Sequence, residues 1–541
     1  MTRRLSIILS SKKLRFIQSL CAVTAITLAG LLIGPQQVAQ AQQNQTVCTT
    51  LAAVVIRPGD PTVQASTVAT LTTLYTVPYT GTTSTSQCTA ADTGAVWGLA
   101  IQRATPNVFY TSAVMMSGAG FGEGGSGGIY RNQQDKPASN ELFVDLDALG
   151  FATRPANFPA TNAARGLTGI ITDTVEGAIT SMFIDKQRAQ VGRMSLGDID
   201  ISPTNDTLWT VNLFDRSLVR IKIPTGNAKP TAADVTKFSI PAPTSGGDSI
   251  CVRDEYRPWG LKVLTDTVYV GVTCTDENHT GTEPGEGVNP DLRGVIYKYD
   301  VAGNSWTPLS ITTKGQANPY FPLKGYRWDH DINSDGSLNR QYILVDLEID
   351  KDGSFIVGLA DRWPMVGRAS GAPKQPWSQG DIVRICNASG TLTLEDGGKC
   401  DGNGHGPATV SGNDLVGYYN DLPDDPKFQA AHAENQTGGI ALLPLPESRL
   451  VSMAYNPVNP SGAGNRSGFQ VFDNKTGEVT WSFELVQAAK EAGYGKAGGL
   501  GDIEVLCDAP TADEETDEPT ADPDSAEPSL LNRIFVPFVV Q

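Results

Sequence analysis

The stretch Leu196-Gly197-Asp198-Ile199-Asp200-Ile201 recurs twice along the chain, first in the form Val345-Asp346-Leu347-Glu348-Ile349-Asp350 and then in the form Leu500-Gly501-Asp502-Ile503-Glu504-Val505. In every copy apolar residues alternate with acids, which is the period of a β-strand. Two of the copies run on into a turn and a further strand. A strand unit that recurs in this way predicts a repeat architecture, and a β-propeller is the closed form that fits it best.

Similar units can be followed between residues 92 and 507. Five of them contain three predicted strands each and begin near Ala95, Asp198, Arg257, Ile343 and Gly438. A sixth begins at Gly501, where no chain is left to complete it. Because an unpaired end strand would be an exposed edge, we expect strands from residues 42–90 to complete the last blade. The predicted fold is all-β: a propeller of six four-stranded antiparallel blades closed by N- and C-terminal strands, with five or seven blades as alternatives.

Residues 1–41 have the features of a secretory signal peptide. A basic start precedes the apolar stretch 16–34, and Ala39-Gln40-Ala41 fits a cleavage site with small residues. We expect cleavage near Gln42, with an uncleaved signal anchor as the alternative. No later stretch is long and apolar enough to span a bilayer. The sequence therefore predicts a secreted or cell-surface protein with no transmembrane span in the mature chain.

The formal net charge of -17 argues against a nucleic-acid partner, which demands a basic surface. We expect residues 42–507 to form the propeller, with insertions at 133–192 and 401–436 and a helix over 173–191. Residues 508–529 are rich in acids and proline, which is typical of a disordered linker. The apolar tail 530–541 could dock to a surface or sorting component, or could fold back as a strand.

Eight cysteines are present, and seven remain if Cys21 is lost with the signal peptide. Export permits disulfides. Local spacing favours three pairs and leaves Cys507 over as a buried thiol or an intermolecular partner. The pairs suggested by spacing are Cys48 with Cys88, Cys251 with Cys274, and Cys386 with Cys400.

The repeated acids are the strongest candidates for metal ligands. Alternate residues of a strand share a face, so acids from several inner strands could converge near the central axis and hold Ca²⁺ through oxygen ligands. The alternative is that each carboxylate accepts backbone N–H bonds from the next blade. The candidates are Asp198, Asp200, Asp346, Glu348, Asp502 and Glu504.

A second calcium candidate is the segment Asp331-Ile332-Asn333-Ser334-Asp335-Gly336. Asp331, Asn333 and Asp335 alternate, and glycine stands at the sixth position, as at the start of an EF-hand loop. The twelfth position is Tyr342, so the bidentate acid is missing. An Asx turn in solvent is the alternative interpretation.

Three other features have plain structural interpretations. The glycine-rich run 118–128 is not followed by Lys-Ser/Thr, so we expect a flexible loop and no phosphate site. His330 and His432 lie near acids and could form acid–base pairs, or could simply be solvated. Five tryptophans could stack on sugars or pack between blades: Trp209, Trp259, Trp328, Trp363 and Trp377.

Taken in order, five segments of the chain resemble secreted bacterial β-propeller proteins that are known through the SdrD B-like repeats after their propeller. The segments are 96–99, 197–201, 257–263, 346–353 and 501–507. The resemblance covers roughly residues 92–507. It implies export, a location at the surface or in the matrix, and no assigned enzymatic activity. In place of the repeats, this chain carries the acidic linker and the apolar tail.

These observations favour a secreted or cell-surface propeller that acts as a binding or structural module, stabilised by Ca²⁺ if the acids are ligands. Its expected partners are a protein or a glycan at the cell surface. Two alternatives stay open. One is a metal-dependent lactonase or esterase of the six-bladed propeller type, in which inner-strand acids hold the metal. The other is a carbohydrate-binding lectin. No catalytic residue can be assigned.

Overall fold

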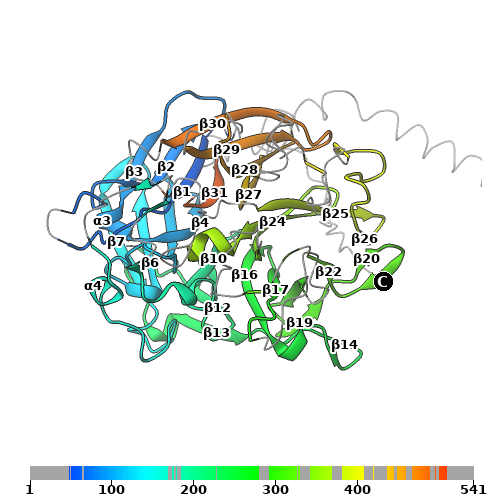
Figure 1. The fold of residues 1–541 in the computed structure, drawn as a ribbon, viewed down its shortest axis with the longest axis horizontal. Coiled ribbons are helices and arrows are strands. Elements are labelled where there is room, and N and C mark those ends of the chain that lie inside the picture. The colour runs from blue at the N-terminus through cyan, green and yellow to red at the C-terminus, as the bar shows by residue number, and fades with distance from the viewer. Residues whose placement is uncertain are drawn as a thin grey trace, which may run out of the picture.

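Figure 1 shows the chain as a computed structural model in which six antiparallel sheets surround a central axis. The structure describes residues 48–507 with internal gaps, the longest at 279–291, 329–340, 368–379, 407–417, 420–434, 459–465 and 488–493. The predicted six-bladed propeller is confirmed. Within the described residues, no helix is long and apolar enough to cross a membrane.

Each of the first five blades is a meander whose first strand lies nearest the axis. Successive side chains point to opposite faces of a sheet, and the inner strands are buried along nearly their whole length, so each sheet packs both faces against neighbouring blades. The first two blades contain β4 (Val96–Gln102), β5 (Val108–Ala113), β6 (Gly128–Gln133) and β7 (Lys136–Asp145), then β10 (Leu196–Ile201), β11 (Thr207–Asn212), β12 (Ser217–Lys222) and β13 (Val235–Ser239).

The third and fourth blades carry extra strands at their outer edges. The third contains β16 (Tyr256–Val263), β17 (Thr267–Cys274), β18 (Arg293–Asp300), β19 (Ser305–Pro308) and β22 (Phe321–Pro322). The fourth contains β23 (Tyr342–Ile349), β24 (Phe355–Asp361), β25 (Asp381–Ala388) and β26 (Thr391–Leu394), extended by β20 (Ile311–Thr313) and β21 (Gln316–Asn318). The pairing of β20 with β26 is parallel.

The fifth blade is regular, and the sixth is shared by the two ends of the described chain. The fifth contains β27 (Gln436–Leu443), β28 (Arg449–Tyr455), β29 (Arg466–Asp473) and β30 (Val479–Gln487). In the sixth, β31 (Leu500–Leu506) is the inner strand, and β1 (Thr50–Val55), β2 (Thr72–Pro78) and β3 (Thr85–Thr89) complete it. The antiparallel pairing of β1 with β31 closes the ring, as the sequence predicted.

The disulfides correct one prediction. Cys48 is bonded to Cys507, whereas Cys88 on β3 is a buried free thiol. The register sets Thr50 opposite Leu506, so the residues just outside those strands meet although 459 positions separate them. Local spacing was misleading because ring closure brings together the two ends of the propeller. The other two predicted bonds, Cys251–Cys274 and Cys386–Cys400, are confirmed. Burial raises the pKa of the Cys88 thiol, which keeps it protonated.

The segment between β7 and β10 differs from the prediction. The outer strand β7 begins at Lys136, inside the expected insertion 133–192. The expected helix over 173–191 is wrong, because its described part holds the short pair β8 (Thr174–Val175) and β9 (Ala178–Ile179) and the 3-10 turn η2 (Arg188–Gln190). Short helices occur elsewhere: α3 (Ala90–Thr93), α4 (Asn162–Arg165) and α6 (Arg362–Val366).

The aromatic core supports packing between blades. Four of the five candidate tryptophans are buried: Trp209, Trp259, Trp328 and Trp363. The rings of Trp97 and Trp259 meet edge to face, with centroids 5.4 Å apart. These four residues are therefore core residues and offer no face to a sugar. Trp377 lies outside the described residues, as does most of the predicted insertion 401–436.

Candidate functional site

The inner strands place a repeated pattern around the axis, where β4, β10, β16, β27 and β31 lie near the centre of Figure 1. We call a set of six residues, one from each inner strand at the same height along the axis, a level. At the first level, glycine alternates with aspartate from blade to blade. At the second level, two residues further along each inner strand, the residue types vary. The first level is Gly98, Asp198, Gly260, Asp346, Gly439 and Asp502, and the second is Ala100, Asp200, Lys262, Glu348, Ala441 and Glu504.

The glycines let neighbouring inner strands approach each other. A Cβ atom on Gly98 would lie 2.8 Å from the backbone nitrogen of Ile199. On Gly260 it would lie 2.6 Å from the nitrogen of Asp346. On Gly439 it would lie 2.5 Å from the carbonyl oxygen of Gly501. Any side chain at these positions would push two blades apart, so three alternate interfaces of the ring depend on glycine.

The three aspartates of the first level tie the other three interfaces together. Leu261 donates its backbone N–H to Asp198 Oδ2 at 3.0 Å, and Ile440 donates to Asp346 Oδ2 at 2.8 Å. Leu99 donates to Asp502 Oδ2 at 3.1 Å. The second oxygen of each carboxylate accepts the N–H of the residue that follows it. The structural alternative stated for these acids is therefore confirmed at the first level.

The second level holds a lysine among acids. Lys262 Nζ lies 3.0 Å from Glu348 Oε1, and Val263 donates its N–H to Asp200 Oδ2 at 2.8 Å. Burial opposes the charge on Lys262, but the charges of Glu348, Glu504 and Asp200 raise its pKa well above the usual range. The pKa values of Glu348 and Glu504 are both raised, and burial is the largest cause. The ammonium group thus supplies positive charge where the acids gather.

No group of three or more His, Cys, Asp and Glu side chains is arranged to hold a metal ion in the part of the chain that the structure describes. The assignment of the six inner-strand acids as Ca²⁺ ligands stays a prediction. Asp331, Asn333 and Asp335 lie outside the described residues, as do His330 and His432.

The first-level aspartates share a strongly perturbed titration. Burial raises the pKa of Asp346 to about 7, with a further contribution from Glu348. Burial and the charge of Asp346 raise the pKa of Asp198 and Asp502 well above the usual range. Such coupled carboxyls keep a proton in the folded state that an unfolded chain would release.

This coupling predicts that stability declines as pH rises. Because the folded pKa values are raised, the contribution is fully present below about pH 4 and is lost as pH rises through about 7. Asp502→Asn should make the dependence of the melting temperature on pH between 5 and 8 shallower than in the wild type. The exposed Asp248→Asn is the matched control and should leave the slope unchanged. Equal slopes for Asp502→Asn and the wild type would contradict the coupling.

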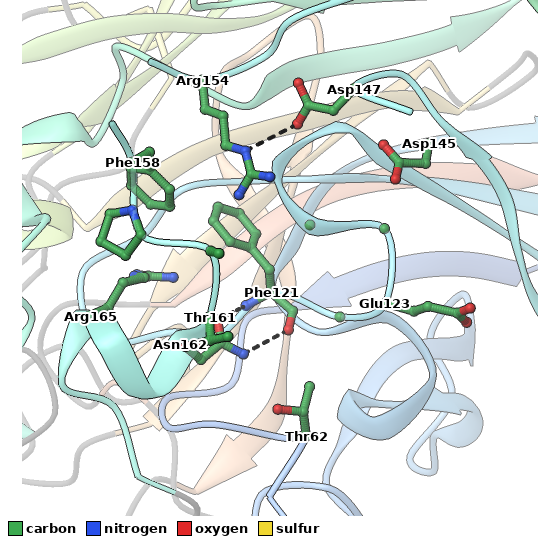
Figure 2. Close-up of a pocket in the computed structure, with 15 residues that line it drawn as sticks. Thr62, Phe121, Glu123, Asp145, Asp147, Arg154, Phe158, Thr161, Asn162 and Arg165 are labelled. Atoms are coloured by element: carbon green, nitrogen blue, oxygen red, sulfur yellow. Dashed lines mark hydrogen bonds and ion pairs between the residues drawn. The ribbon is translucent and has the colours of Figure 1, made fainter. Parts of the chain in front are cut away.

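Sequence reasoning missed a cavity of about 320 Å³ beside the first and sixth blades (Figure 2). Its walls come from the β1–β2, β5–β6 and β7–β10 connections, which are far apart in the sequence. The lining includes Thr62, Phe121, Glu123, Asp145, Asp147, Arg154, Phe158, Thr161, Asn162 and Arg165. The glycine-rich run 118–128 forms one wall of this cavity, whereas the sequence predicted only a loop there.

This run forms the predicted loop between β5 and β6, and the loop is closely packed. A Cβ atom on Gly122 would lie 2.6 Å from the carbonyl oxygen of Thr93. On Gly124 it would lie 2.5 Å from Leu142 Cδ1. Ser126 is buried, and its hydroxyl donates to Asp147 Oδ2 at 3.0 Å. The glycines therefore serve close packing against neighbouring strands.

Comparison with known proteins gives one sequence relative and several distant structural likenesses. No family model matches the chain. Colossin-D of Dictyostelium discoideum is 24% identical over 452 residues, which cover 80% of this chain and 42% of that protein. The chain thus spans less than half the length of this curated relative.

Two solved structures of similar shape have low identity to this chain. A chain of the nidogen/laminin complex is 9% identical, with 84% of this chain and 98% of that chain covered and a TM-score of 0.35. A gluconolactonase from Xanthomonas campestris is 10% identical, with 80% and 88% covered and a TM-score of 0.33. These likenesses assign no activity to this chain.

Proposed function

We propose that this chain is an exported β-propeller that acts as a binding or structural module at the cell surface. Three disulfides support the view that the chain folds in an oxidising compartment, where such bonds persist. The signal-like segment 1–41 and the resemblance to secreted bacterial propellers agree with that location. The expected partner is a protein or glycan of the surface, and the tail 530–541 would dock to a surface or sorting component.

The observation that carries a non-enzymatic role is the state of the first-level aspartates. Asp198, Asp346 and Asp502 are 3%, 6% and 2% exposed, and each spends both carboxylate oxygens on backbone N–H groups. A metal-dependent lactonase needs inner-strand oxygens that are free to hold a metal within reach of substrate. The carboxylate oxygens of these three aspartates hold the ring together instead, which favours a module without catalysis.

We expect Ca²⁺ to leave the stability of the folded protein nearly unchanged. The inner acids already have backbone or lysine partners, so a cation would have to displace them. Thermal unfolding of the full-length chain in a chelator and then in millimolar Ca²⁺ should give melting temperatures that agree closely. A large upward shift would show that the folded state binds the metal, and the acids would then be ligands after all.

The same preparations test the enzyme alternative. Hydrolysis of a panel of aldonolactones, followed with and without Ca²⁺, should stay at the uncatalysed rate. Metal-dependent turnover that is abolished by Asp346→Asn, while this variant keeps the wild-type circular dichroism, would overturn the proposal. It would place a catalytic metal at the axis.

A further inference from the structure

We propose that the cavity beside the first blade binds a neutral saccharide unit, an inference that rests on the proposed role as a binding module. The cavity lies away from the axial acids, and none of its lining residues takes part in closing the ring. Its volume of about 320 Å³ lies at the small end of the range for small-molecule sites, which suits a mono- or disaccharide.

The cavity is preformed. Asn162 of α4 donates through Nδ2 to the carbonyl oxygen of Phe121 at 2.9 Å and to Asp60 Oδ1 at 2.9 Å. Phe121 donates its backbone N–H to Asn162 Oδ1 at 3.0 Å. These bonds join the three connections that form the walls. A ligand would therefore bind without first ordering the site, which lowers the entropic cost of binding.

Hydrogen-bond donors and acceptors both line the cavity. Figure 2 shows Arg154 beside Asp147, with Asp145 and Glu123 along the same side. The contact between Arg154 Nε and Asp147 Oδ2 is long, at 3.5 Å, so the guanidinium group of Arg154 can still donate to a ligand. Asp147 itself already accepts hydrogen bonds from Ser126 and Thr153.

Arg165 adds a buried donor from the opposite side. Its side chain is only 1% exposed, and Asp185 holds Nη2 at 2.6 Å. The guanidinium carbon lies 5.1 Å from the ring centroid of Phe121. The remaining nitrogen, Nη1, has no hydrogen-bond partner among the residues that the structure describes. A buried N–H without an acceptor is costly, and an oxygen of a ligand in this cavity would satisfy it.

The charge pattern selects the class of ligand. An anion would meet the carboxylates of Glu123, Asp145 and Asp147, whereas a cation would meet the guanidinium group of Arg154. A neutral polyhydroxylated ligand avoids both conflicts, because each hydroxyl donates to a carboxylate and accepts from an arginine. The rings of Phe121 and Phe158 meet edge to face and add an apolar part to the lining, although both side chains are largely buried.

The glycine at position 125 allows the cavity to be blocked without disturbing its walls. Gly125 has φ of 57°, and a Cβ atom there would meet nothing within 4 Å. Asparagine tolerates this backbone conformation, so Gly125→Asn should fold and place an amide in the open space. Gly246 has φ of 60° and equally open surroundings in the turn between β14 (Thr244–Ser245) and β15 (Asp248–Ser249). Gly246→Asn is therefore the matched control.

The experiment is a glycan array of neutral and uronic-acid saccharides probed with the full-length chain, followed by calorimetric titration of the best saccharide. We expect a neutral saccharide to bind, Gly125→Asn and Arg154→Met to weaken it at least tenfold, and Gly246→Asn to bind like the wild type. Circular dichroism of all variants verifies that they fold.

Other results separate the two proposals. Saccharide binding that Gly125→Asn leaves unchanged would move the site elsewhere and overturn this inference, while the binding module would stand. Binding of uronic acids only, lost in Gly125→Asn, would overturn the neutral class. An array without any hit would overturn the saccharide inference, whereas failure to find the chain at the cell surface would overturn the proposed function.

Discussion

Lys262→Met should lower the free energy of unfolding by about 3 kcal/mol, because it leaves buried acids without their cation. Lys262 Nζ lies 3.0 Å from Glu348 Oε1, and Glu348 has a side chain only 7% exposed. Glu504 and Asp200 act on the same ammonium group. Methionine matches the apolar stem of lysine and lacks only the ammonium group, so the loss measures charge rather than packing. Urea unfolding at pH 7, with equal m-values for both proteins, gives the difference.

Lys298→Met is the control for this experiment. Lys298 is an exposed lysine on β18 in the same blade, and we expect its replacement to change the free energy of unfolding by less than about 0.5 kcal/mol. If Lys262→Met were as mild as Lys298→Met, the second-level acids would not need the ammonium group. If added Ca²⁺ restored the stability of Lys262→Met alone, the lysine would be standing where a metal ion can bind.

Replacing both Cys48 and Cys507 by serine should cost about 5 kcal/mol, the largest stability loss expected from any disulfide of this chain. The bond joins residues 459 positions apart, so its removal frees almost the whole propeller in the unfolded state. It also removes the covalent link that stands beside the pairing of β1 with β31. Chemical denaturation under non-reducing conditions measures the difference from the wild type.

The double replacement of Cys386 and Cys400 is the matched comparison. That disulfide spans 14 positions, and its removal should cost about 3 kcal/mol. A larger loss for the short loop than for the ring-closing bond would contradict the argument from chain entropy. It would mean that the ends of the propeller stay together by strand pairing even in the denatured chain, where the disulfide would then add little constraint.

Part of this site could be predicted because its signals are local. The alternation of Asp198 and Asp200 with apolar residues identifies an inner strand, and the incomplete unit at Gly501 predicts that the N-terminal strands close the ring. The use of the acids as ties between blades was one of two interpretations, because a sequence does not say which backbone N–H will face a carboxylate.

By itself, the sequence predicted the strand repeat and the shared last blade, and it favoured six blades over five or seven, because strand periodicity and turn residues act over a few positions. Only the tertiary structure decided which distant groups meet. It paired Cys48 with Cys507, set Lys262 against Glu348 86 positions away, and built one cavity from three separate connections. Such contacts follow from closing the ring and from the register between blades, which no local pattern encodes.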